Sequence, residues 1–134
     1  MLKAPLARLS EPIYAAFRVV TGVLFAFHGA QKILGLFGGQ QPPVGSQFWF
    51  AGVIELVCGI LIAIGLLTGL AALLASGEMA AAYFIAHAPK GTWPIENGGE
   101  LAAVYCFAFL FIAARGGGRF SVDGTSRGPS SYRR

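Results

Sequence analysis

The feature that most constrains this chain is the position of three charged residues. Arg18, Glu55 and Glu78 each lie inside a stretch that is otherwise apolar enough to cross a bilayer. A charge at membrane depth costs at least ~2.5–3.5 kcal/mol on insertion scales, so it normally faces a partner or a water-filled cavity. Three such residues in a chain of 134 residues predict a polar interior inside a bundle of membrane helices.

The composition is that of a membrane protein rather than of a soluble domain. Hydrophobic residues make up 55% of the chain and charged residues 12%, whereas soluble domains carry about 25% charged residues. The net charge of +4 does not indicate nucleic-acid binding, because six of the ten basic residues gather at the two ends of the chain. These six are Lys3, Arg8, Arg119, Arg127, Arg133 and Arg134. Their placement follows the positive-inside rule.

The apolar pattern predicts an all-α fold, a bundle of four transmembrane helices. A helix needs ~20 residues to cross a ~30 Å hydrocarbon core. The expected spans are residues 13–28 with a helix continuing past Lys32, then 48–67, 70–88 and the shorter 101–114. The expected domains are an N-terminal segment 1–12, a membrane domain 13–116 and a basic tail 117–134, which we expect to be disordered.

The charges at the ends of the spans predict that both termini are cytoplasmic. Basic residues flank the first and fourth spans, namely Lys3, Arg8, Arg115 and Arg119. The outer loops then hold only Lys32 and Lys90, and Trp49 and Trp93 lie at the outer interface. A cleaved signal peptide is the alternative for the first span, and Arg18 in its middle argues against cleavage.

Helical phase gathers the polar residues on defined faces. One stripe on the first span, within an arc of roughly 80° at 100° per residue, holds Arg18, Thr21, Phe25, His28 and Lys32, with Gln31 beside it. On the second span Glu55 lies between Gly52 and Gly59, and on the third Glu78 lies among alanines. Small residues around a carboxylate mark a helix-packing face. Both glutamates are therefore expected to point into the bundle.

Depth along the helices separates two groups of polar residues. Arg18 and Glu78 lie roughly 8–12 Å from the inner ends of their helices at ~1.5 Å per residue, which predicts a structural ion pair. His28 and Glu55 lie roughly 8–10 Å below the outer ends by the same rise, and they are the candidates for proton handling. The candidates for substrate binding are Gln31, Lys32, His87 and Glu100. For Glu100 the alternative is a carboxylate that stabilises a helix N-terminus.

A weak internal repeat relates the two halves of the chain. Each half has a mid-helix charge nine or ten residues before a histidine, a lysine three or four residues later, and a Glu-Leu pair further on. The matched positions are Arg18 with Glu78, His28 with His87, Lys32 with Lys90, and Glu55 with Glu100. Two hairpins of the same topology would be related by an axis along the membrane normal. Chance matching is the alternative.

Four groups of motifs, taken in order, resemble those of the DoxX family. They are Arg18 with Gly22 and Leu24-Phe25-x-x-His28-Gly29-x-Gln31-Lys32; Glu55-Leu-x-x-Gly59 with Ile64-Gly65-Leu66-x-Thr68; Glu78-Met79-x-x-Ala82 with His87 and Lys90-Gly91; and Glu100-Leu101-x-x-x-Tyr105 with Gly118-Arg119-Phe120-Ser121-Val122-Asp123. The resemblance implies a four-helix protein of the bacterial cytoplasmic (inner) membrane. Some members are linked to thiosulfate:quinone oxidoreduction and others to thiol and oxidative-stress complexes, so the fold transfers better than the reaction.

No cofactor motif identifies the reaction. The chain has no G-x-G-x-x-G, no Walker motif and no CxxC, and Cys58 and Cys106 lie alone on separate spans. Free buried cysteines usually behave as small hydrophobes. His28 and His87 are of the type that binds haem iron, but we expect neither a haem nor a metal. The cofactor and the residues that would bind it stay unknown from the sequence, and a quinone is one cofactor that the resemblance allows.

Three functions remain open. The first is a membrane subunit of a quinone- or thiol-linked redox system, with an outward-facing polar pocket and redox-enzyme partners; if catalytic, it is an oxidoreductase subunit rather than a self-sufficient enzyme. The second is a non-catalytic scaffold or assembly factor. The third is a small-solute or proton pathway along the polar stripe. A homo-oligomer is also left open, because Gly65-x-x-x-Gly69 suits a helix dimer as well as a tight hairpin.

Overall fold

The computed structural model describes residues 4–126, and this part of the chain is helical throughout, without strands. The long helices are α1 (Ser10–Leu34), α2 (Gln47–Ile64), α3 (Thr68–Ala82) and α5 (Glu100–Arg115). The short elements are the 3₁₀ turn Ala7–Leu9, the π-helical segment Tyr83–His87, the 3₁₀ turn Ala88–Lys90, and the helices α4 (Pro94–Asn97) and α6 (Val122–Thr125). The prediction of an all-α fold is confirmed for these residues.

Within residues 4–126, three helical stretches are long and apolar enough to cross a membrane. They are Ala7–Leu34, Gln47–Ile64 and Thr68–Lys90. The fourth long helix, α5, has 16 residues, so at ~1.5 Å per residue it is shorter than a ~30 Å hydrocarbon core. The length and composition of these helices are those of a membrane protein. The fourth span and the cytoplasmic placement of both termini stay predictions.

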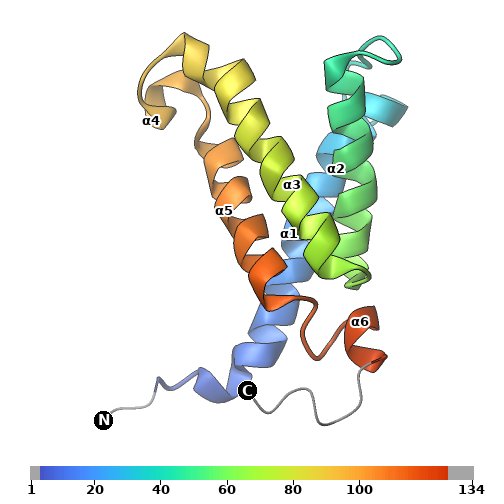
Figure 1. Cartoon of the computed structure of the whole chain (residues 1–134), viewed down its shortest axis with the longest axis vertical. Coiled ribbons are helices and arrows are strands. Elements are labelled where there is room, and N and C mark those ends of the chain that lie inside the picture. Colours follow the sequence, from blue (N-terminus) through green and yellow to red (C-terminus); the bar gives the residue numbers. More distant parts are fainter. Residues whose placement is uncertain (1–3, 127–134) are drawn as a thin grey trace.

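The four long helices pair into two hairpins that diverge toward one end of the molecule (Figure 1). Helix α1 packs on α2, helix α3 packs on α5, and the hairpins meet mainly through α2 and α3. The start of α1, the α2–α3 turn and α6 lie at the converging end, whereas the α1–α2 loop and α4 lie at the diverging end. The two hairpins are therefore further apart at the diverging end than at the converging end.

Glycines bring α1 and α2 into backbone contact. A Cβ atom on Gly22 would lie 2.7 Å from the Gly59 carbonyl oxygen, and one on Gly59 would lie 2.6 Å from the Ala26 nitrogen. A Cβ atom on Gly29 would overlap the backbone of Leu56. Because small residues let membrane helices approach closely, these glycines set the spacing of the first hairpin.

The segment after α5 closes the turn between α2 and α3. Helix α2 ends at Ile64 because Gly65 takes a left-handed conformation with φ of 75°. The Asp123 carboxylate accepts hydrogen bonds from the backbone N–H of Leu67 and of Thr68 and from the Thr68 hydroxyl, at 3.0, 2.9 and 2.7 Å. These are among the N–H groups that a helix start leaves without internal partners.

The prediction of a disordered tail over 117–134 is therefore wrong for residues 117–126. This stretch has a defined structure, because Asp123 and Ser121 bind it to the turn and to itself. The Ser121 hydroxyl accepts from the Gly124 N–H at 3.0 Å and caps α6. Residues 127–134, which include the remaining basic residues of that tail, lie outside the described residues.

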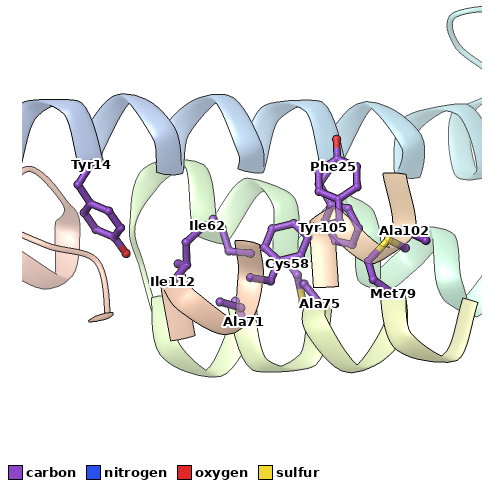
Figure 2. Close-up of a cluster of buried hydrophobic side chains, with 12 residues drawn as sticks. Tyr14, Phe25, Cys58, Ile62, Ala71, Ala75, Met79, Ala102, Tyr105 and Ile112 are labelled. Atoms are coloured by element: carbon purple, nitrogen blue, oxygen red, sulfur yellow. The ribbon is translucent and has the colours of Figure 1, made fainter. Parts of the chain in front are cut away.

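The core is a narrow layer between the hairpins. Helix α3 contributes the small residues Ala71, Ala72 and Ala75, which let α5 pack closely against it. Larger side chains fill the layer where the hairpins begin to separate. Figure 2 shows Phe25 beside Tyr105, and Met79 and Ala102 lie close to this pair. The aromatic residues thus form the boundary between the packed core and the space beyond it.

Candidate functional site

A cavity of about 740 Å³ lies between the two hairpins. Ligand pockets in proteins usually measure about 300–1,000 Å³ and have mostly apolar walls with a few polar groups. The ionisable and hydroxyl side chains on this wall are His28, Lys32, Glu55, Glu78, His87 and Tyr105. Apolar residues of α2, α3, the π-helical segment and α5 make up most of the remainder, among them Phe48, Phe50, Leu73, Leu74, Ile85 and Leu101. The cavity is therefore amphipathic.

A buried ion pair joins α1 to α2 on the cavity wall. The Lys32 Nζ lies 2.6 Å from Glu55 Oε1, and the Glu55 side chain is only 2% exposed whereas that of Lys32 is 29% exposed. Gly52, one turn before Glu55, makes room for the lysine, because a Cβ atom there would lie 2.7 Å from the Lys32 Cβ. The lysine thus lies flat on α2 with its ammonium directed at the carboxylate.

Glu78 of α3 meets this ion pair from the other hairpin. Its carboxyl group lines the same cavity as that of Glu55. The Oε2 atoms of both residues are buried and receive no hydrogen bond from any donor in the described residues. Lys32, Glu55 and Glu78, the acidic triad of the cavity, therefore bring one ammonium and two carboxyl groups to the same cavity wall.

Two histidines line the cavity on opposite hairpins. The His28 ring packs edge-on against Tyr105, with ring centroids 6.1 Å apart. The His87 Nδ1 lies 3.4 Å from the Asn97 carbonyl oxygen, at the end of the π-helical segment Tyr83–His87. π-helical turns often occur at functional sites. Within residues 4–126, no three His, Cys, Asp or Glu side chains are arranged to hold a metal ion.

Asn97 organises the loop that carries His87. Its side-chain amide donates to the Tyr83 hydroxyl at 3.2 Å and to the Gly91 carbonyl at 3.1 Å, and its Oδ1 accepts from the Gly99 N–H at 2.8 Å. Asn97 is 4% exposed. One amide therefore connects the π-helical segment, the following loop and the start of α5, which fixes this rim of the cavity.

The predicted ion pair between Arg18 and Glu78 is not formed. Arg18 is 1% exposed, and its guanidinium donates to the carbonyls of Ile62, Ala63 and Phe120 at 2.5, 2.6 and 2.7 Å. The last carbonyls of a helix lack internal partners and attract cations. Arg18 is thus bound to the C-terminal end of α2, while Glu78 lines the cavity with Glu55.

Gln31 and Glu100 lie outside the cavity wall. The Gln31 amide turns to the α1–α2 loop and donates to the Phe37 carbonyl at 3.2 Å. Glu100 is exposed in the first turn of α5, where a carboxylate stabilises a helix N-terminus. Of the six residues predicted for proton handling and substrate binding, the structure brings together His28, Lys32, Glu55 and His87.

The polar stripe of α1 does not continue through the molecule. Phe25, which is fully buried, packs against Phe109 and Tyr105 with ring centroids 4.6 and 5.6 Å apart. This aromatic cluster separates Arg18 at the converging end from His28 and Lys32 at the cavity. Helical phase alone did not reveal the interruption, because Phe25 lies on the same face as its polar neighbours.

Two residues of the site were not among the predicted site residues. Tyr105 forms part of the cavity floor, and Asn97 holds the rim. Asn97 precedes Gly98-Gly99, a combination typical of a turn, but only the folded loop reveals that its side chain is buried. Tyr105 lies five residues after Glu100 on an apolar helix, where an aromatic residue is usually part of a core.

Comparison with known proteins supplies a family. The family model described as DoxX matches residues 13–88. An uncharacterized protein of Haemophilus influenzae is 42% identical over 121 residues, which cover 84% of this chain and 90% of the relative. No solved structure matches this chain.

Proposed function

This chain belongs to the DoxX family, and we propose that it is the quinone-binding membrane subunit of a redox system. The observation that carries the proposal is the acidic triad at the polar end of an otherwise apolar cavity. A quinone needs this combination, because its ring oxygens exchange protons while its prenyl chain is apolar. The chain of a quinone would lie along the apolar residues of α2 and α3.

The polar residues of the cavity suit the two parts of quinone chemistry. Reduction of a quinone takes up two electrons and two protons. The ammonium of Lys32 and the hydroxyl of Tyr105 are hydrogen-bond donors for the ring oxygens. The carboxyl groups of Glu55 and Glu78 exchange protons with them, and His28 is a further proton carrier at the same wall. The electrons come from a partner protein that oxidises a thiol or a reduced sulfur compound.

The membrane placement that goes with this function is the bacterial inner membrane. With both termini cytoplasmic, the cavity opens toward the outer face, because the α1–α2 loop and α4 lie at its end of the molecule. A proton pathway across the whole molecule is less well supported, since the aromatic cluster of Phe25, Tyr105 and Phe109 separates the cavity from the converging end.

Purification from bacterial membranes tests the proposal. We expect organic extraction of the purified protein to yield quinone, and a photoreactive quinone to label residues of the cavity wall in competition with unlabelled quinone. Glu55→Gln should reduce both signals, because it removes the charge that holds Lys32 in place. Glu100→Gln is the matched control, since Glu100 is exposed and outside the cavity wall.

Two results would contradict this function. Labelling that is equal in the wild type and in Glu55→Gln would place the quinone elsewhere. A colourless protein without quinone that still co-purifies with a partner enzyme would support the scaffold or assembly function instead.

A further inference from the structure

We propose that the cavity selects the reduced form of its ligand, a hydroquinone, because the unsatisfied groups at its polar end are hydrogen-bond acceptors. This inference rests on the proposed function and adds the redox state of the ligand to it. The residues involved are those of the acidic triad, Lys32, Glu55 and Glu78.

Three buried side-chain atoms of the described residues have no hydrogen-bond partner. In the described residues these atoms are Arg18 Nε, Glu55 Oε2 and Glu78 Oε2. Arg18 is held at the far end of α2, so both orphan atoms at the cavity are carboxyl oxygens. Glu55 is 2% exposed, so bulk water gives it little compensation. Burying a carboxylate oxygen without a donor costs free energy, and a ligand that supplies a donor recovers it.

The donors of the cavity do not balance these acceptors. Lys32 already donates to Glu55 Oε1 at 2.6 Å, and its side chain is 29% exposed, so its other N–H groups can reach water. The Tyr105 hydroxyl on the cavity wall is a further donor, and a hydroxyl also accepts. Around Glu55 and Glu78 the cavity therefore presents two acceptor oxygens without a donor, beside an ammonium that is already engaged.

The two forms of a quinone differ in this property. The oxidised form carries two carbonyl oxygens, which only accept and would face carboxyl oxygens. The reduced form carries two hydroxyl groups, which donate. A hydrogen bond to a charged group contributes about tenfold or more to an equilibrium constant. We therefore expect the hydroquinone to bind about tenfold more tightly than the quinone.

Selective binding of the reduced form has a consequence for electron transfer. Tighter binding of the hydroquinone raises the reduction potential of the bound couple, by about 30 mV for each tenfold ratio of affinities in a two-electron couple. A bound quinone is then a better electron acceptor than free quinone in the bilayer. The site thus favours reduction of quinone by the partner protein over oxidation of quinol.

Anaerobic binding of decylubiquinol and decylubiquinone to the protein in lipid nanodiscs tests this inference. The wild type should bind decylubiquinol about tenfold more tightly. Glu78→Gln should bring the ratio of affinities close to one, because its amide replaces an acceptor with a donor. Glu100→Gln should keep the wild-type ratio, since that residue is exposed in the first turn of α5.

The possible outcomes distinguish selectivity for the hydroquinone from quinone binding itself. Equal affinities in the wild type, or a preference for decylubiquinone, would overturn the selectivity and leave quinone binding intact. A preference that survives in folded Glu78→Gln, as judged by unchanged size-exclusion elution, would also overturn it. Binding of neither compound to the wild type would overturn the proposed function and the inference together. The ratio of the two affinities in the wild type tests the selectivity even if Glu78→Gln does not fold.

Discussion

The residue with the largest structural role is Arg18. A guanidinium has five N–H donors in a fixed fork, and three carbonyls from α2 and the segment after α5 accept from it. Gly65 follows the end of α2 and lies so close that a Cβ atom there would be 3.0 Å from Arg18 Nη1. Arg18 therefore stabilises the converging end of the molecule rather than the cavity.

We predict that Arg18→Met lowers the free energy of unfolding in detergent by about 2–3 kcal/mol, because buried carbonyls lose their donor. Arg18→Lys should recover only part of this loss, since a single ammonium cannot reproduce the fork. Denaturant unfolding followed by circular dichroism measures both effects.

The charge-swapped pair distinguishes this role from an ion pair with Glu78. If Arg18 binds carbonyls, Arg18→Glu with Glu78→Arg should be no more stable than Arg18→Glu alone. Recovery of wild-type stability in the double variant would mean that the two side chains meet in the membrane.

At the residue scale, the sequence identified the buried charged residues but not the groups that they contact. The cost of a charge in lipid identified Arg18, Glu55 and Glu78. Depth placed Arg18 and Glu78 at similar heights, but depth does not specify which side of a helix meets which neighbour. The carbonyl partners of Arg18 could not be read from the sequence, because every residue has a carbonyl. The fold makes two of them available at the end of α2 and brings the third, from Phe120, in the segment after α5.

At the scale of the elements, glycine sets the geometry of the first hairpin. The expected small-residue face of α2, with Gly52 and Gly59, lies against α1. Gly59 permits backbone contact, and Gly52 permits the approach of Lys32 to Glu55. The packing of helices thus also forms the ion pair of the cavity.

Two glycines make a matched pair for this element. Gly59→Ala should lower the free energy of unfolding by about 1–3 kcal/mol, because its Cβ would lie 2.6 Å from the Ala26 nitrogen. Gly77→Ala should leave stability unchanged or raise it by up to about 1 kcal/mol, since a Cβ on Gly77 has no neighbour within 4 Å. Equal effects of the two substitutions in thermal unfolding would contradict the close contact of α1 and α2.

The segment after α5 is the second element that determines stability. Asp123→Ala should cost about 1–2 kcal/mol, as expected for loss of a side chain that caps a helix start. Ser126→Ala is the control, because its hydroxyl donates only to the nearby Asp123 carbonyl and is exposed. Limited proteolysis measures the loss as faster cleavage near the α2–α3 turn, and an unchanged cleavage rate would mean that α6 does not hold the turn.

In the segment after α5, amino-acid composition is a poor guide to order. Residues 117–134 are rich in Gly, Ser and Arg, which is typical of disorder. One aspartate provides the acceptor that the start of α3 lacks, and a serine caps α6. The hydrogen bonds of Asp123 join residues 55 or 56 positions apart, so a local reading of the sequence could not find them.

At the scale of the whole molecule, the two hairpins converge at one end and enclose a cavity at the other (Figure 1). The apolar spans and the short turn between α2 and α3 made the helices predictable. The cavity was not predictable in shape, because it depends on how far the hairpins diverge. The polar residues that line it were mostly identified, since His28, Lys32 and Glu55 lie at one depth on neighbouring helices.

The central claim is that an amphipathic ligand occupies this cavity, and a cavity-filling substitution tests it most directly. Gly77 lines the cavity and has no neighbour within 4 Å of an added Cβ, so Gly77→Trp can fold with its indole in the cavity. Val104→Trp is the control, because Val104 is 65% exposed and outside the cavity wall.

The measurement is equilibrium binding of decylubiquinol in lipid nanodiscs by the wild type and these two variants. If the ligand occupies the cavity, the wild type and Val104→Trp bind decylubiquinol saturably, and Gly77→Trp does not. Undiminished binding by Gly77→Trp would contradict occupation of the cavity.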